Sequence, residues 1–229
     1  MVNVVSFDVC GTLINSYYLD YIWNEILPEL FAKKKGLRLE EAKNYVFGEY
    51  DRIGNKDLRW YLPEFWFKHF NLNEDPIEIF KAYTDKVRFF PEVSSVIKRL
   101  SQKYDLIIAS GIPAKYAEIT IVKIRHFFKN IFSPVSDLQK VNKTIEFYQM
   151  ICNDLKIEPS KLAHIGDEWI FDFIIPRKVG IKSFFLDRTG ERRGRYIIKD
   201  LEEFEGRLSQ MESKSTHANE IDDESIYNN

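Results

Sequence analysis

The amino-acid sequence predicts an α/β fold with a doubly wound parallel sheet and a smaller helical domain. After Pro91, short apolar segments alternate with helical segments of about 10 to 15 residues. Polar turns follow the apolar segments directly. Strands that alternate with helices need parallel crossover connections, so both faces of the sheet should be covered by helices.

The first strand is predicted over residues 2–7, a short apolar segment rich in valine. It ends at a polar turn that contains Asp8, Cys10, Gly11 and Thr12. A buried strand that stops at such a turn is typical of a strand that presents a functional loop.

A helical, aromatic-rich region is predicted from residue 14 to about residue 87. Breaks between its helices are expected near Gly36, near Gly54 and over residues 71–76. The alternating region then follows. Its predicted strands lie at 105–109, 162–165 and 182–186, with a short apolar segment at 131–135, and its helices at 91–103, 114–128, 144–155 and 170–179.

Composition limits the possible partners. Thirty-three Lys and Arg balance 35 Asp and Glu, giving a formal charge of −2, so no basic field favours nucleic acid. No signal peptide or membrane span is recognised, and two cysteines are too few for a disulfide framework. We therefore expect a cytoplasmic monomer or homodimer with no nucleic-acid or membrane partner.

Polar residues follow the predicted strands at the positions where chemistry is expected. Asp8 follows the first strand, Ser110 the second, and Asp167 with nearby Asp172 the strand ending at residue 165, while Lys143 opens a helix. Carboxyl ends of parallel strands meet at one edge of the sheet, so these residues should become neighbours. Carboxylates, a lysine and hydroxyl donors around a hard cation would offset the charge of a phosphoryl group under attack by a carboxylate.

The order of these motifs resembles that of the haloacid dehalogenase-like superfamily. Residues 7–13, Phe-Asp-Val-Cys-Gly-Thr-Leu, are similar to its first motif, whose usual form is D-x-D-G-T-L. The second, third and fourth motifs correspond to Ser110-Gly111, to Lys143 and to residues 166–172.

The resemblance implies a role for each matched residue. Asp8 would be the nucleophile that forms an aspartyl-phosphate, and Mg²⁺ would be held by Asp8, the Val9 carbonyl and Asp167. Asp172 would belong to the same metal site, in its outer shell or bound to Lys143. The phosphoryl group of a small phosphorylated substrate would be bound by Ser110, Gly111 and Lys143, while Cys10 and Thr12 would complete the catalytic loop. Residues 1–14 and 89–211 would form the core and 15–88 a helical cap, followed by a disordered tail at 212–229.

Cys10 departs from the family pattern, because most phosphatases of the family have an aspartate there that serves as acid and base. Such catalysis typically contributes about 10²–10⁴-fold. A good leaving group or another proton donor could compensate.

Two alternatives stay open beside the phosphatase. A metal-independent 2-haloacid dehalogenase also lacks the second aspartate, although it usually has tyrosine at this position and the acidic cluster here favours a metal. A non-catalytic ligand-binding member of the superfamily would have lost turnover through Cys10.

Overall fold

Six parallel strands form one sheet in the order β3-β2-β1-β4-β5-β6 in the computed structural model, which describes residues 1–215, with side chains to Met211. The prediction of a doubly wound parallel α/β sheet is confirmed. The strand order reverses between β1 and β4, and ligands bind beyond the carboxyl ends of strands at such a point. The strands are β1 (Val4–Phe7), β2 (Asp105–Ala109), β3 (Phe128–Phe132), β4 (Leu162–Gly166), β5 (Lys182–Leu186) and β6 (Ile197–Ile198).

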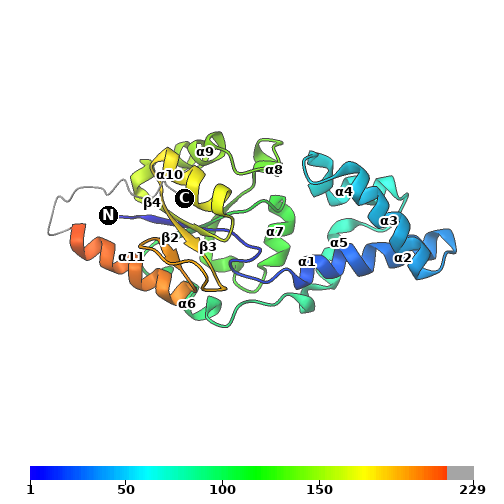
Figure 1. The fold of residues 1–229 in the computed structure, drawn as a ribbon, viewed down its shortest axis with the longest axis horizontal. Coiled ribbons are helices and arrows are strands. Elements are labelled where there is room, and N and C mark those ends of the chain that lie inside the picture. The colour runs from blue at the N-terminus through cyan, green and yellow to red at the C-terminus, as the bar shows by residue number, and fades with distance from the viewer. Residues whose placement is uncertain (216–229) are drawn as a thin grey trace.

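Helices cover both faces of the sheet (Figure 1). Val5 and Phe7 pack on one face with α6 (Val93–Leu100) and α11 (Leu201–Ser215). Val4 packs on the other face with α9 (Ile145–Leu155), beside α10 (Ile175–Val179). Side chains alternate between the faces of a strand, so a short, almost wholly apolar strand supplies both layers of the core.

A helical insertion, residues 15–88, lies beyond the carboxyl ends of the strands (Figure 1). It has its own hydrophobic cluster, which includes the buried side chains of Phe31, Val46 and Trp66. Its elements are α1 (Tyr17–Tyr21), a π-helix (Ile22–Ile26), α2 (Leu27–Lys35), α3 (Leu39–Ile53), a 3₁₀ turn (Leu58–Tyr61), α4 (Pro63–His69), α5 (Pro76–Ala82) and a 3₁₀ turn (Thr84–Lys86).

The predicted breaks in the insertion are confirmed. α2 and α3 end at Gly36 and Gly54, whose φ angles of +67° and +73° suit glycine. After α4, Asn71 adopts a left-handed conformation with φ +55°, and Pro76 opens α5. Proline is favoured there because the first turn of a helix needs no N–H from it.

Part of the sequence-based prediction after β2 is wrong. The helix expected over 114–128 stops at Thr120 (α7, Ala114–Thr120), and β3 begins at residue 128, inside that range and ahead of the short apolar segment at 131–135. Lys129 and Asn130 are exposed on this edge strand, which hides its apolar pattern. Pro134 opens α8 (Pro134–Asp137), where the Ser133 hydroxyl accepts from the Ser136 N–H at 3.4 Å.

The C-terminal helix α11 continues through residue 215, so residues 212–215 are helical. The rest of the predicted disordered tail, residues 216–229, lies outside the described residues. Among residues 1–215, none of the helices combines the length and apolar character that crossing a membrane requires.

Candidate functional site

The loop after β1 is tightly folded around a buried carboxylate. Asp8 is only 6% exposed, and its backbone N–H donates to the Ile165 carbonyl of β4 at 2.9 Å. Gly11 has φ +82°, and a Cβ there would lie 2.0 Å from an Asp167 carboxylate oxygen. Only glycine therefore lets this loop approach Asp167 so closely.

Lys143 is buried between two of the predicted acidic residues. Its Nζ lies 2.5 Å from Asp8 Oδ1 and 2.6 Å from Asp172 Oδ1. Although burial alone would lower it, the charges of Asp172 and Asp8 hold the pKa of Lys143 above its ordinary value. Lys140, the other lysine near the start of this helix, pairs with Glu146 on the surface, so Lys143 is the lysine that the fold brings to the site.

Asp172, in the π-helical turn Trp169–Ile174, has both carboxylate oxygens engaged by protein groups. Oδ1 lies 2.6 Å from Lys143 Nζ and 3.0 Å from His164 Nε2, and Oδ2 accepts from the Glu168 N–H at 3.1 Å. Burial alone would raise the pKa of Asp172, but Lys143 and His164 hold it well below its usual range. His164 is fully buried and also bonds Ser6 at 2.9 Å, which fits a core histidine that orients Asp172.

Three carboxylates converge at the carboxyl ends of β1 and β4. Ligand oxygens of Asp8, Asp167 and Asp172 all lie within 4.8 Å of one another. Burial raises the pKa of Asp8 to about 8, which Lys143 offsets only in part. Burial and the charge of Asp172 raise the pKa of Asp167 to about 6. Thr12 donates its hydroxyl to Asp167 at 3.4 Å.

Ser110 and Gly111 lie on the neighbouring strand end, after β2. Ser110 is 1% exposed, and its hydroxyl oxygen accepts from the Ile112 N–H at 3.3 Å. The hydroxyl can therefore still donate to a ligand oxygen. Both residues line the same cavity as Asp8 and Lys143.

Cys10 and Val9 differ in what they offer to this cavity. Cys10 lines it, whereas Val9 is fully buried and its carbonyl oxygen accepts from the backbone N–H groups of Leu13 and Ile14 at 2.9 and 3.0 Å. Both lone pairs of that oxygen are thus used inside the turn. This geometry leaves no free lone pair on the Val9 carbonyl for the expected metal contact.

The Cys10 thiol is a weak acid in this setting. Burial, followed by the charges of Asp8 and Asp167, raises the pKa of Cys10 to about 12. The thiol therefore keeps its proton at neutral pH and does not reproduce a carboxylic acid.

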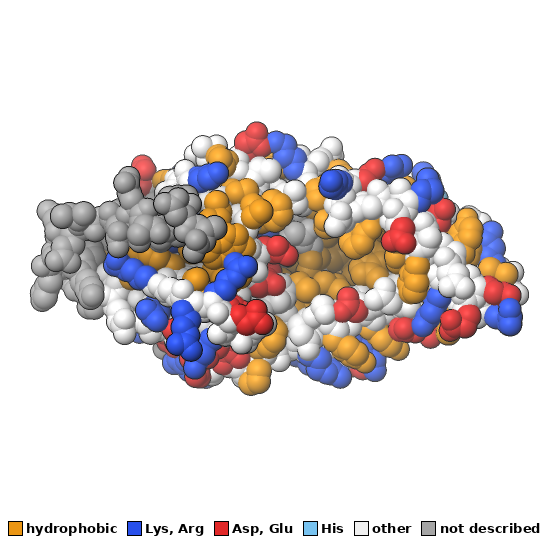
Figure 2. Space-filling view, in the orientation of Figure 1, with side chains coloured by type: hydrophobic (Ala, Val, Ile, Leu, Met, Phe, Trp, Pro, Cys, Tyr) orange, Lys and Arg blue, Asp and Glu red, His pale blue; other side chains and the backbone are white. Residues whose placement is uncertain are grey.

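A cavity of about 1200 Å³ separates these groups from the helical insertion. Core side chains that line it include Asp8, Ser110, Lys143, Asp167 and Arg188. Figure 2 shows the hollow between the two parts of the molecule, with acidic side chains at its core side and apolar ones towards the insertion.

Arg188 is a site residue that the sequence-based prediction missed. Its guanidinium donates to the carbonyls of Gly11 and Thr12 at 3.2 and 2.7 Å, pairs with Glu92 at 2.8 Å and lies 3.5 Å from the ring centroid of Phe90. It thus ties the loop after β1, which we call the nucleophile loop after the role expected for Asp8, to the segment that leads out of the insertion. Its position directly after β5, with Asp187, was the signal that could have revealed it.

The comparisons with known proteins agree with this geometry. Residues 2–180 match the family described as haloacid dehalogenase-like hydrolase. The chain belongs to the haloacid dehalogenase-like hydrolases. It is 29% identical over 72 residues to the GMP/IMP nucleotidase YrfG of Escherichia coli, a match covering 31% of this chain and 32% of that protein. The matched segment thus spans about a third of that relative.

Solved structures of family members share the fold over most of the chain. A phosphatase from Thermococcus onnurineus has a TM-score of 0.77 at 22% identity, covering 91% of this chain and 98% of its own. The putative hydrolase YfnB from Bacillus subtilis, bound to magnesium, has a TM-score of 0.62 at 16% identity, with 91% and 99% covered. A 2-haloacid dehalogenase from Pseudomonas syringae has a TM-score of 0.59 at 14% identity, with 92% and 100% covered. These likenesses concern the fold alone.

Proposed function

We propose that this haloacid dehalogenase-like hydrolase is a Mg²⁺-dependent phosphatase that uses Asp8 as its nucleophile. The observation that carries the proposal is the group of three carboxylates within 4.8 Å, with Lys143 as the buried cation between two of them. When all three carboxylates are ionised, their negative charge exceeds the single positive charge of Lys143 in a largely buried site. A divalent cation with a preference for oxygen would neutralise it.

The donor set fits Mg²⁺ if Asp8 and Asp167 are the carboxylate ligands. These two carry raised pKa values, as expected for buried carboxylates that lack sufficient positive charge. Asp172 is already satisfied by Lys143, His164 and a backbone N–H, so we assign it to holding Lys143 rather than to the metal. When bound, Mg²⁺ would neutralise charge on the phosphoryl oxygens.

The chain's own groups then account for two half-reactions. An Asp8 carboxylate oxygen attacks phosphorus and the bond from phosphorus to the ester oxygen breaks, so that an aspartyl-phosphate forms. The leaving oxygen takes a proton from water and departs as the alcohol. Lys143 and the Ser110 hydroxyl hold the phosphoryl oxygens. Water then attacks the phosphorus of the aspartyl-phosphate, which releases inorganic phosphate and restores Asp8.

The thiol at Cys10 favours substrates whose leaving group departs without protonation. A carboxylic acid would protonate the departing oxygen, whereas a thiol whose pKa is raised to about 12 gives up its proton reluctantly. Esters with acidic leaving groups, such as aryl phosphates, need this proton least. We therefore expect them to be the best test substrates.

We propose further that the insertion, residues 15–88, acts as the cap over a core made of residues 1–14 and 89–211. Closure of such a cap excludes water from an active site. A contact between the two parts supports this role, because Tyr116 of α7 donates to Glu64 of α4 at 2.5 Å. A small phosphorylated metabolite as substrate, a cytoplasmic location and a monomeric or dimeric state stay predictions.

The deciding assay measures phosphate release from p-nitrophenyl phosphate with Mg²⁺ and with EDTA, and halide release from 2-chloropropionate in parallel. Phosphate release that requires Mg²⁺ supports the proposal. Halide release without metal would support the dehalogenase instead. Activity in neither assay would support a ligand-binding protein. Lys143→Met should abolish turnover, while the matched surface variant Lys140→Met should leave it unchanged.

A further inference from the structure

The cavity has two walls of different chemistry. On the core side, Asp8, Ser110 and Lys143 suit a phosphate group. The wall from the helical insertion is apolar and aromatic, and Figure 2 shows apolar side chains in this part of the hollow. Its lining residues include Leu19, Trp23, Trp60, Tyr61, Pro63 and Phe80.

Two of these rings lie against each other on the 3₁₀ turn Leu58–Tyr61. The Trp60 and Tyr61 ring centroids lie 5.4 Å apart at an interplanar angle of 59°. The Trp60 carbonyl accepts from the Trp66 indole N–H at 3.0 Å, and the Tyr61 hydroxyl donates to the Asn55 carbonyl at 3.1 Å. Both residues are half-buried and line the cavity. We call Trp60 and Tyr61 the ring pair.

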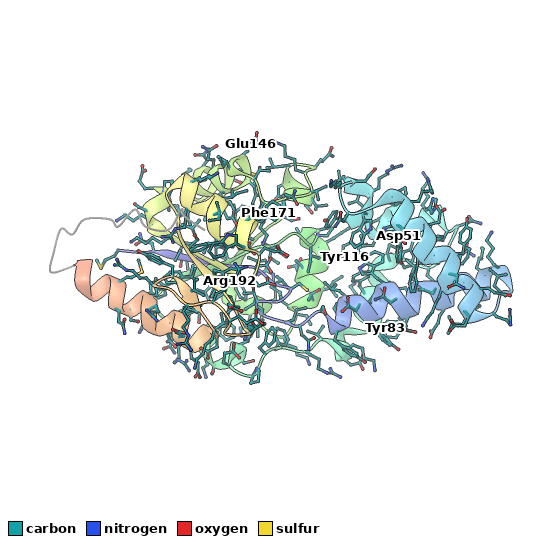
Figure 3. The ribbon with its side chains drawn as sticks, viewed as in Figure 1. Asp51, Tyr83, Tyr116, Glu146, Phe171 and Arg192 are labelled. Atoms are coloured by element: carbon teal, nitrogen blue, oxygen red, sulfur yellow. The ribbon has the colours of Figure 1, made fainter. Side chains whose placement is uncertain are left out.

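The ring pair faces the catalytic edge of the sheet across the cavity. Trp60, Tyr61 and Glu168 all line this cavity, and burial followed by the charge of Glu168 raises the pKa of Tyr61. Phe171 of the same turn lines the cavity from the core, on the side facing the insertion (Figure 3). A ligand anchored at Asp8 would therefore extend between aromatic groups of both parts.

The remaining lining groups narrow the chemistry of that ligand. A volume of about 1200 Å³ far exceeds what a phosphate ion needs. A sugar phosphate alone would place hydroxyls against apolar rings, at a cost in desolvation. Asn15, Asn55 and Lys56 also line the cavity, and their exposed polar groups offer hydrogen bonds that a fatty chain would not use. A flat heterocycle suits both the aromatic rings and the polar lining groups, because its faces stack on rings and its edge forms hydrogen bonds.

We propose that the substrate is a nucleoside monophosphate, with its phosphate at Asp8 and its base stacked on Trp60 and Tyr61. This inference rests on the proposed function, because it assumes that the phosphate binds at Asp8. In this proposal the ring pair selects the base. A substitution in the ring pair should therefore slow the hydrolysis of substrates that have a base and leave the hydrolysis of other substrates unchanged.

The test compares kcat/KM for guanosine 5′-monophosphate and ribose 5-phosphate, which differ by the base. Stacking of one base on an aromatic side chain is worth about 1–3 kcal/mol, so Trp60→Leu should lower kcat/KM for the nucleotide about 5- to 150-fold. The loss should fall mainly on KM, because the base is bound equally before and during the reaction. Ribose 5-phosphate should be unaffected, and Trp60→Phe should restore most of the nucleotide activity.

Tyr45→Leu is the matched control, because Tyr45 is an aromatic residue of the insertion that is 54% exposed and stacks on Phe31, outside the cavity lining. It should change neither substrate. Equal losses of Trp60→Leu on both substrates would overturn the ring pair as a base site. The proposal would also be overturned if kcat/KM for the nucleotide were no higher than for ribose 5-phosphate while p-nitrophenyl phosphate is hydrolysed well. The rings would then bind aryl phosphates.

A calorimetric titration separates failure of this inference from failure of the proposed function. If none of the phosphate esters, including p-nitrophenyl phosphate, is hydrolysed, the phosphatase proposal fails by itself. Guanosine 5′-monophosphate should still bind the wild-type protein, and about tenfold more weakly to Trp60→Leu. Absence of nucleotide binding to the wild-type protein would overturn the base site.

Discussion

Arg188→Met tests whether the nucleophile loop depends on one arginine. The substitution keeps an apolar stem but removes hydrogen bonds to the Gly11 and Thr12 carbonyls, the ion pair with Glu92 and the contact with Phe90. Hydrogen bonds to charged groups contribute about 1.5–3 kcal/mol each, with the 3.2 Å bond at the weak end. The partly exposed ion pair contributes up to about 1 kcal/mol. These terms overlap, so we expect a loss of about 3 kcal/mol.

The position of Arg188 predicts more than a loss of stability. Gly11 and Thr12 both touch Asp167, so a loosened loop should widen the carboxylate group and weaken Mg²⁺ binding. A loss of about 3 kcal/mol corresponds to a fall in melting temperature of about 6–12 °C for a chain of this size. Urea denaturation measures the stability, and calorimetric titration with Mg²⁺ below the melting temperature measures the site.

Arg177→Met is the matched control. Arg177 donates to the Ser183 carbonyl at 2.9 Å and lies over the rings of Phe173 and Tyr196 at 4.8 and 4.1 Å, away from the nucleophile loop. It should also destabilise the protein, yet leave Mg²⁺ affinity unchanged. If Arg188→Met loses stability but binds Mg²⁺ as tightly as the Arg177 variant, the loop does not need the arginine and the reasoning is refuted.

The other predictions concern the carboxylates and the thiol. Asp8→Asn should abolish phosphate release while the circular dichroism spectrum stays native, because Lys143 keeps Asp172 as its partner; a variant that turns over normally would remove Asp8 as nucleophile. Cys10→Asp should raise turnover of alkyl phosphates more than of aryl phosphates, and equal or reduced rates for both would exclude Cys10 from the proton transfer. Because the pKa values of Asp8 and Asp167 are raised to about 8 and about 6, Mg²⁺ must displace protons from them. Mg²⁺ affinity should therefore increase as pH rises between about 6 and 8, with proton release measurable in buffers of different ionisation enthalpy, and an affinity independent of pH would contradict the raised values.

Much of the fold could be predicted because it depends on local patterns. The buried strands β1, β2, β4 and β5 are short and apolar, and each is followed by a polar turn that shows where it ends. Glycines and a proline mark the breaks between the helices of the insertion. Edge strand β3 was misplaced because exposed residues interrupt its apolar pattern, and the two-residue strand β6 is too short to leave one.

The order of strands and motifs along the chain predicted that Asp8, Ser110, Lys143 and Asp167 lie close together, because the carboxyl ends of parallel strands meet at one edge of the sheet. How these side chains share their contacts is a property of the tertiary structure. Packing decides that the Asp172 carboxylate contacts Lys143 and His164, so that it is not free to hold a metal cation.

The sequence by itself determined the class of fold and the acidic groups at the strand ends, since these follow from residue type and spacing. Its resemblance to the family motif showed the departure at Cys10. Only the tertiary structure decided that the Val9 carbonyl is used within its turn, that Arg188 ties the loop to the insertion, and that Trp60 and Tyr61 face the catalytic edge. The physical reason is that hydrogen-bond partners and cavity walls join residues distant in the chain. Their energies depend on distances that a linear pattern does not contain.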